Sequence, residues 1–240
     1  MATDRRDQRC SNLGRVRGTE AAPPGDSSDR SRPRSRRLPR SVRERQIVDA
    51  AVEVFAEHGF HQASMDEISE TAGVSKPMLY AYLGSKEELF SACVRREANR
   101  LIEAISGAVG TDLRPDEQLW HGLRAFFAHV SEHRASWTIL HRLASSNESP
   151  STSEMTRWRE QAVDLIARLL AQATADAAKP VQPDQMHPFA VALAGASESL
   201  VEWWGENPDH TADGLAMRLM NLVWMGFGDL VEGRSWEPSK

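Results

Sequence analysis

The chain has 240 residues, 40% of them apolar, which is enough to bury a core in one ordinary domain or two small ones. A net charge of −5 excludes a protein coated in nucleic acid, and only two cysteines, Cys10 and Cys93, predict neither a disulfide framework nor a cysteine metal site. The longest apolar run, residues 190–204, contains Glu198 and Glu202, which argues against a transmembrane helix. A cytoplasmic protein with no membrane partner is expected.

Charge is distributed unevenly along the chain. Residues 1–40 hold eleven arginines and five acids, a balance of +6, whereas the remaining residues hold 18 basic and 29 acidic side chains, a balance of −11. The segment 22–40 is rich in Pro, Ser, Gly and Arg with almost nothing apolar to bury, which predicts a disordered basic arm. A solvated linker or a wrongly chosen start codon would give the same composition.

Two helices are predicted after the arm. From Ser41 the apolar residues recur at three- and four-residue steps, which indicates an amphipathic helix ending at Gly59. A short second helix follows, in which Ser64 and Glu67 have the spacing of a capping box and Gly73 is the stop.

The third predicted helix is only about two turns long. Ser75 is its expected N-cap, Pro77 lies in the first turn where a missing N–H costs nothing, and Gly84 ends it. Ser85 and Glu88 then form another capping box, which begins a long helix running to about residue 109.

The rest of the chain is helical in pattern, with no competing strand alternation and no internal repeat. The approximate spans are 115–133, 136–145, 152–176, 184–206 and 210–232. The prediction is an all-α protein with an N-terminal domain of three helices and a C-terminal helical bundle. Its divisions are a disordered arm at 1–40, the three-helix domain at 41–90 and the bundle at 91–240.

A short exposed helix joined across a glycine to another short helix is typical of a helix-turn-helix unit, whose second helix enters the DNA major groove. Short capped helices also occur as connectors in purely structural bundles. The segment Val42–Val94 contains a set of residues in a recognisable register: Phe55, Gly59, Ile68, Ala72, Gly73, Val74, Ser75, Leu79, Tyr80, Lys86 and Leu89. With these residues it resembles the DNA-binding region of tetracycline-repressor-type (TetR) regulators. The resemblance implies that residues 41–90 are a helix-turn-helix DNA-binding domain and that residues 91–240 are a bundle for ligand binding and dimerisation.

The resemblance implies a set of DNA contacts. They are Ser64, Ser75, Lys76, Pro77, Met78, Tyr80, Tyr82 and Lys86. Arg40 and Arg43 are also predicted to contact DNA, Arg40 as the last member of an arginine cluster just before the first helix. The two serines would offer hydroxyl and N–H groups to phosphates, Lys86 a point charge, and the two tyrosines contacts along the backbone. Lys76 would contact guanine O6 or N7, and Pro77 or Met78 a thymine methyl. Alternatively, Tyr82 belongs to the core and Pro77 chiefly stiffens the first turn.

Two positions depart from the family pattern: Asp66 stands where a basic or polar DNA contact is common, and Leu83 replaces a common Phe. Asp66 would repel phosphate unless it accepts from cytosine N4 or partners the helix dipole. Residues 41–90 carry four basic and nine acidic side chains, so arginines of the arm are expected to supply the missing attraction. Removing residues 1–38 should weaken DNA binding and flatten its salt dependence; unchanged affinity and slope would show the arm to be a bystander.

All seven tryptophans follow residue 115. With other large apolar residues they suggest a wide apolar interior, although each is equally suited to an ordinary core. The resemblance implies an effector cavity among the middle helices. The residues predicted to line it are Trp120, Phe127, Trp137, Leu140, Trp158, Phe189, Leu193 and Trp224.

No cofactor, metal site or enzymatic activity is expected. The pairs His58/His61 and His129/His133 have ligand spacing but no third ligand, and nucleophile-elbow, P-loop and dinucleotide motifs are missing. The last two long helices mix small and large apolar residues, as a four-helix dimer interface requires, and the resemblance implies the same arrangement.

The combined prediction is a homodimeric regulator, a repressor, that binds a pseudo-palindromic double-stranded operator and leaves it when a small lipophilic effector fills the cavity. Two alternatives remain open. One is a DNA-binding regulator of the same fold without a ligand response, either constitutive or an activator. The other is a small-molecule-binding helical protein that has lost operator binding.

Overall fold

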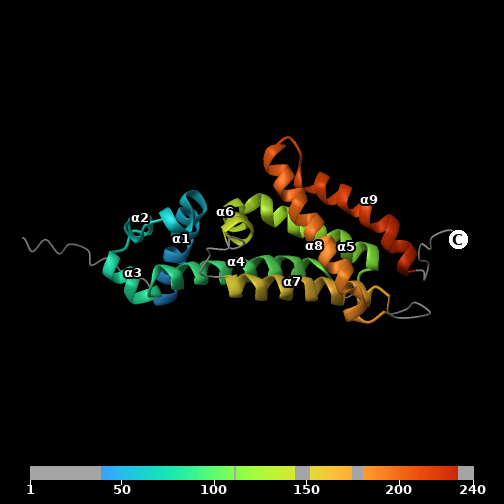
Figure 1. Cartoon of the computed structure of the whole chain (residues 1–240), viewed down its shortest axis with the longest axis horizontal. Coiled ribbons are helices and arrows are strands. Elements are labelled where there is room, and N and C mark those ends of the chain that lie inside the picture. Colours follow the sequence, from blue (N-terminus) through green and yellow to red (C-terminus); the bar gives the residue numbers. More distant parts are fainter. Residues whose placement is uncertain (1–38, 111, 144–151, 175–180, 232–240) are drawn as a thin grey trace, which may run out of the picture. The chain divides into compact units, whose positions relative to one another are not determined.

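All secondary structure in the part of the chain that the structure describes is helical, so the all-α prediction is confirmed (Figure 1). The computed structural model describes residues 39–110, 112–143, 152–174 and 181–231. The predicted basic arm therefore lies outside the described residues, except for its last two positions.

The helix-turn-helix unit consists of α1 (Arg40–Gln62), α2 (Met65–Thr71) and α3 (Lys76–Leu83). Gly59, the predicted end of the first helix, is instead a kink with φ of 76°, after which α1 continues for three residues. Gly73 has φ of 62° in the turn between α2 and α3. A side chain at either position would strain this left-handed backbone, which is why glycine occupies both.

The two predicted capping boxes differ. Ser64 Oγ accepts from the backbone N–H of Glu67 at 3.1 Å, but the carboxylate of Glu67 lies 2.8 Å from His58 Nε2. Only the serine half of that box is therefore present, because the carboxylate ties α2 to α1 instead. At the start of α4 (Lys86–Ala108), Ser85 and Glu88 form both hydrogen bonds, at 3.1 and 2.7 Å.

Aromatic rings hold this unit together. Phe55 and Phe90 are fully buried, with ring centroids 5.0 Å apart in an edge-to-face arrangement, and Phe60 lies 5.2 Å from Phe90. Leu79 of α3 is also fully buried in the same core. Edge-to-face pairs add a preferred geometry to the burial of apolar area, so α3 rests on a well-ordered base.

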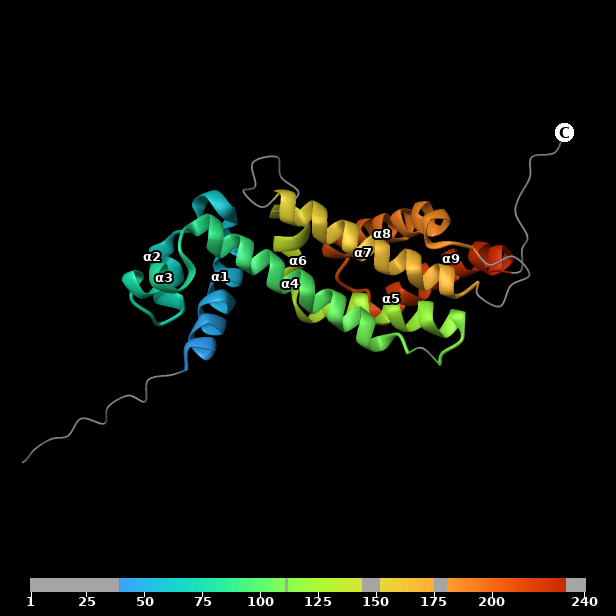
Figure 2. The same ribbon diagram turned by 90° about the horizontal axis from the view of Figure 1, so that it is seen from below.

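The remaining helices form a bundle around the rest of α4. They are α5 (Pro115–Glu132), α6 (Arg134–Thr138), a π-helical turn η1 (Ile139–Leu143), α7 (Thr152–Gln172), α8 (Pro183–Glu206) and α9 (Ala212–Val231). In both views α7 runs beside α4 (Figure 2), while α8 packs on α7 and α9 on α5. The predicted helix at 136–145 begins two residues earlier and changes to a π-helical turn at Ile139.

The helix α4 belongs to both parts of the described chain. It packs against α1 at its start and against α5 and α7 farther along, and one apolar core continues from Ile47 to Leu219. The domain boundary at residue 90 therefore stays a prediction. None of the described helices has the length and apolar character to span a membrane.

Candidate DNA interface and effector cavity

One side of α3 faces the core and the other faces solvent. Leu79 is the buried residue of the helix, and Tyr82 and Leu83 are half-buried against the core. Met78 and Tyr80 are exposed by 38% and 46% of their surface, although large apolar side chains usually avoid water. Exposed apolar groups beside polar ones are suited to a partner surface rather than to solvent alone.

An ion pair joins α2 to the first residue of α3. Lys76 Nζ lies 2.8 and 2.9 Å from the two carboxylate oxygens of Asp66. The hydrogen bond to Asp66 is the largest cause of a raised pKa at Lys76. The acidic residue that departs from the family pattern thus has a partner within the protein.

Other cations of this region contact aromatic rings and backbone. Lys86 Nζ donates to the carbonyl of His61 at 3.1 Å and lies 4.9 Å above the ring of Phe60. The guanidinium of Arg40 lies 5.3 Å from the ring centroid of Tyr82 and donates to Glu44 at 2.8 Å. These contacts fix where the positive charges stand around α3.

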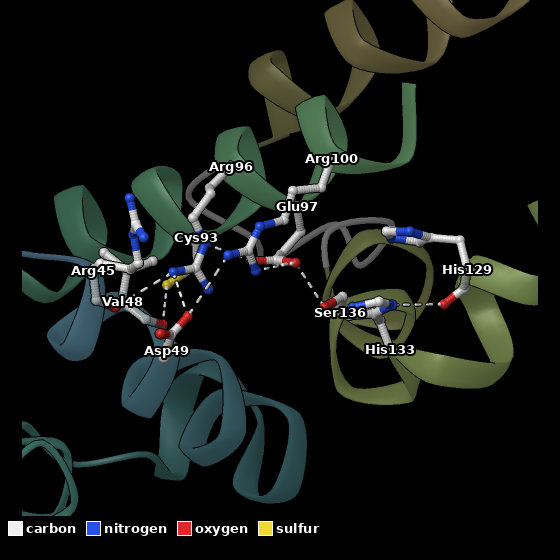
Figure 3. Close-up of polar contacts among 10 residues, drawn as sticks. All are labelled: Arg45, Val48, Asp49, Cys93, Arg96, Glu97, Arg100, His129, His133 and Ser136. Carbon is white, nitrogen blue, oxygen red and sulfur yellow. Dashed lines mark hydrogen bonds and ion pairs between the residues drawn. The ribbon is translucent and has the colours of Figure 1, made fainter. Parts of the chain in front are cut away.

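A buried carboxylate connects α4 to α6. Glu97 of α4 is 0% exposed and accepts from Ser136 Oγ of α6 at 2.7 Å, from Arg96 Nε at 2.6 Å and from Arg100 Nη1 at 3.2 Å (Figure 3). Burial alone would raise the pKa of Glu97, but the Ser136 hydrogen bond and the two arginine charges together hold it below its ordinary value.

The same cluster reaches the helix-turn-helix unit. Arg96 Nη1 lies 2.7 Å from Asp49 Oδ1 on α1, so Ser136, Glu97, Arg96 and Asp49 form a continuous polar chain from α6 through α4 to α1 (Figure 3). Ser136 precedes Trp137, whose side chain lines the cavity described next. A displacement of α6 would therefore alter contacts of α1.

A cavity of about 110 Å³ lies between α4, α5, α6, α7 and α8. One water molecule needs roughly 10–15 Å³ by this measure, so the cavity has room for an organic molecule. Its wall is mostly aliphatic and aromatic; representative residues are Leu101, Ile105, Phe126, Trp137, Leu165 and Leu193. Along α7 the lining extends from Trp158 to Leu170. At 1.5 Å per residue this part of the wall is about 18 Å long, so the cavity is elongated.

A few polar groups interrupt the apolar wall. Gln118 is 8% exposed, and its Nε2 donates to the carbonyls of Leu113 at 3.0 Å and Gly110 at 3.4 Å, which fixes the orientation of the amide. Its Oε1 has no hydrogen-bond partner within the described chain. Glu198 is held by Arg159 Nη2 at 2.9 Å.

Comparison with known proteins decides the family. Residues 47–93 match the family model described as bacterial regulatory proteins, tetR family, and residues 115–226 match the tetracyclin repressor-like C-terminal domain. The chain belongs to the TetR family of DNA-binding transcriptional regulators. The prediction that it is not an enzyme is confirmed by its relatives, which are regulators.

Among TetR relatives, a TetR-like transcriptional regulator from Rhodococcus sp. RHA1 is 40% identical, covers 80% of this chain and 99% of its own, and superposes with a TM-score of 0.67. The transcriptional activator FasR of Mycolicibacterium smegmatis is 29% identical over 72% of this chain and 77% of its own. FadR of Bacillus subtilis, solved in complex with stearoyl-CoA, shares the fold at 18% identity and a TM-score of 0.65, over 75% of this chain and 96% of its own.

The structure brings most of the predicted TetR-type DNA contacts to one region. Lys76, Pro77, Met78 and Tyr80 are exposed on α3, while Tyr82 is half-buried. The others stand around α3, at the start of α1 (Arg40 and Arg43), at the N-cap of α2 (Ser64), at the N-cap of α3 (Ser75) and at the start of α4 (Lys86). Their contacts with DNA stay predictions.

Only three of the eight predicted effector residues line the cavity, namely Trp137, Trp158 and Leu193. Phe127 and Leu140 are buried in the main core, and Trp120 packs on that core. Trp224 packs against the second core, between α7 and α8, and Phe189 is 48% exposed on α8. Residue type alone overstated the role of aromatics, because core and cavity use the same side chains.

The polar groups between α4 and α6 and those in the cavity wall were not predicted from the sequence. Glu97 and Ser136 are 39 positions apart, and their pairing depends on which faces of α4 and α6 meet. An acidic residue flanked by two arginines on the apolar side of a helix was an available signal for Glu97. No signal in the sequence distinguished Gln118 from a surface glutamine.

Of the two histidine pairs considered for a metal, the first places His58 Nε2 2.8 Å from the carboxylate of Glu67. His129 and His133 stack with ring centroids 4.4 Å apart, and burial, followed by the neighbouring His133, lowers the pKa of His129. Within the described ranges, no group of three or more His, Cys, Asp or Glu side chains is placed to hold a metal ion.

Proposed function

We propose that this TetR-family regulator binds a pseudo-palindromic operator as a homodimer and is released from it when a lipophilic effector occupies the cavity. The observation that carries the proposal is the elongated apolar cavity whose wall residue Trp137 adjoins Ser136, the first member of the polar chain to α1. Effector and operator then compete by favouring different positions of α4, with a coupling of about 1–3 kcal/mol.

The shape of the cavity favours a long apolar chain as effector. A lining of about 18 Å along α7, with few polar groups, suits a hydrocarbon chain better than a compact aromatic drug. The names of relatives support the same class of ligand, since FadR of Bacillus subtilis was solved with stearoyl-CoA and FadR of Bacillus halodurans is called a fatty acid degradation regulator.

The proposed dimer interface lies on α8 and α9. Six of the nine exposed large apolar side chains in the described residues are on these helices: Phe189, Val191, Trp203, Met217, Leu222 and Met225. On α8, Phe189 and Trp203 share a face with Ala192, Ala196 and Ser199, which allows a partner helix to approach closely. A second copy of the chain would bury this surface and supply the second recognition helix.

The test uses DNA from upstream of the gene for this protein, labelled for fluorescence anisotropy. Stearoyl-CoA should weaken binding by about 5- to 150-fold, and acetyl-CoA, which has the same head but no long chain, should have no effect. Stearic acid and aromatic ligands are tested in parallel. If one of them weakens operator binding and stearoyl-CoA does not, the effector belongs to that class of lipophilic molecule. If DNA binds and no lipophilic ligand alters the affinity or the melting temperature, the regulator has no effector of this type.

Activation of transcription is a second candidate function beside repression. FasR is named an activator, whereas AcnR of Corynebacterium diphtheriae, 30% identical over 50% of this chain, is named a repressor. Release from DNA would lower expression in the first case and raise it in the second. Transcription measured with and without the gene, and with and without effector, separates them.

A further inference from the structure

We propose that Lys76 and Asp66 act together as a reader of one G·C base pair in each operator half-site. Lys76 donates to guanine N7 and O6, and Asp66 accepts from cytosine N4. The inference rests on the proposed placement of α3 in the major groove, and it adds the base pair that this part of the surface recognises.

The geometry of the ion pair fits the major-groove edge of that base pair. The ammonium lies 2.8 and 2.9 Å from the two oxygens of Asp66, so a donor stands directly beside an acceptor. Guanine O6 and cytosine N4 are joined by an N–H···O hydrogen bond of roughly 2.9 Å, so an acceptor stands beside a donor at about the same spacing. The Lys76–Asp66 ion pair is thus complementary to guanine O6 and cytosine N4.

The two side chains are also placed where bases can reach them. Their side chains are 45% and 66% exposed, and they project from the first turns of α3 and α2, respectively. Pro77 and Met78, the next residues of α3, are also exposed. Ammonium and carboxylate already hold each other, so less side-chain freedom is lost when both meet a base pair. Glu67, the next acid along α2, is occupied by His58 and does not compete for Lys76.

Only one base pair in one orientation satisfies all the groups. From Lys76 to Asp66, a G·C pair presents two acceptors, guanine N7 and O6, and then one donor, cytosine N4. Lys76 donates to the two acceptors, and Asp66 accepts from the donor. A·T and T·A both offer acceptor, donor and acceptor, so the middle and last groups are mismatched. The reversed C·G pair is mismatched at the first and last groups. The pair carries no net charge, so it contributes selectivity rather than attraction to phosphates.

The experiment measures the affinity of the full-length protein for operator duplexes in which every base pair of both half-sites is changed in turn. The wild type should have one G·C position in each half-site at which replacement by any other base pair lowers the affinity by about 5- to 150-fold. The reason is that a base contact of this kind discriminates by roughly 1–3 kcal/mol. In Asp66→Ala, replacing this G·C pair should lower the affinity less than in the wild type, because the contact with cytosine N4 is already missing. Asp66→Ala should also bind random DNA more tightly, with a salt slope steeper by about 1, because Lys76 is then available to a phosphate.

Matched variants separate this inference from the proposed function. Glu70→Ala removes an exposed acid from the same helix without touching Lys76, and it should leave the preference unchanged. A uniform loss of affinity at all positions in Asp66→Ala, or an unchanged preference, would show that the ion pair only positions α3 and would overturn the inference. Tyr80→Ala tests the groove-facing surface itself: if that variant binds the operator normally, the proposed function fails first.

Discussion

Glu97 is a charged residue with no exposed surface, and three donors compensate for its burial. Because its pKa is lower in the folded chain than in an unfolded one, where it is about 4.3, its ionised form stabilises the fold. That stabilisation is complete above the unfolded pKa and is lost as the pH falls through the folded pKa.

Glu97→Gln should lower the free energy of unfolding at pH 7 by about 1–3 kcal/mol, because two partly exposed arginines and Ser136 lose an ionised acceptor. The decline in stability below about pH 4.5 should also be shallower than in the wild type. Denaturant unfolding at pH 7 and at pH 3.5 checks both, with Glu103→Gln, an exposed position on α4, as the control. Equal pH dependence in the Glu97 variant and the wild type would contradict the assignment.

Among the helices, α4 is the element that contacts both the cavity and the helix-turn-helix unit. It contributes Leu101 and Ile105 to the cavity wall, and one turn before Leu101 it carries the carboxylate that binds α6. Coupling between sites requires an element whose position both ligands influence, and we propose α4 for this part.

Ser136→Ala should reduce the effector's influence on DNA affinity by at least half while leaving both separate affinities nearly unchanged. The reason is that the hydroxyl carries the direct contact between α6 and Glu97. The measurement is operator affinity with and without stearoyl-CoA, or with whichever ligand is found to bind. Thr138→Ala removes a hydroxyl of the same helix that bonds only to the carbonyl of Arg134, and it serves as the control. If the effector releases the operator from Ser136→Ala as completely as from the wild type, the Ser136–Glu97 contact does not couple the two sites.

Across the whole described chain, eight of the nine exposed large apolar side chains lie on α3, α8 and α9, the helices for which we propose partners. Met78 and Tyr80 lie on α3, and Leu222 and Met225, exposed by 74% and 78%, lie on α9. A single recognition helix reads only a few base pairs, so useful specificity requires two copies on one operator.

Leu222→Glu combined with Met217→Glu should shift the protein from dimer to monomer, because two charges would be buried in an apolar interface. Sedimentation velocity measures the mass directly. Ser131→Glu, at an exposed site on α5, controls for the added charge. A variant that remains dimeric would place the interface elsewhere.

Local patterns predicted the helices well because their causes are local. Gly73, Gly84 and the Ser85–Glu88 box mark boundaries through short-range hydrogen bonds and backbone conformation. The cavity was predicted less well, since its lining depends on which helix faces meet: Trp158 lines it whereas Trp120 does not. The pairing of Asp66 with Lys76, ten residues apart across a turn, likewise follows only from the folded geometry.

The most direct test of the central claim is operator binding by Tyr80→Ala, measured by anisotropy beside the wild type and Glu53→Ala, an exposed control on α1. Tyr80 is 46% exposed, so its truncation should leave the melting temperature and the dimer intact. We expect that the Tyr80→Ala variant no longer retains the operator, and that Lys86→Ala also loses operator binding. Binding equal to the wild type in both variants would show that the exposed face of α3 does not contact DNA.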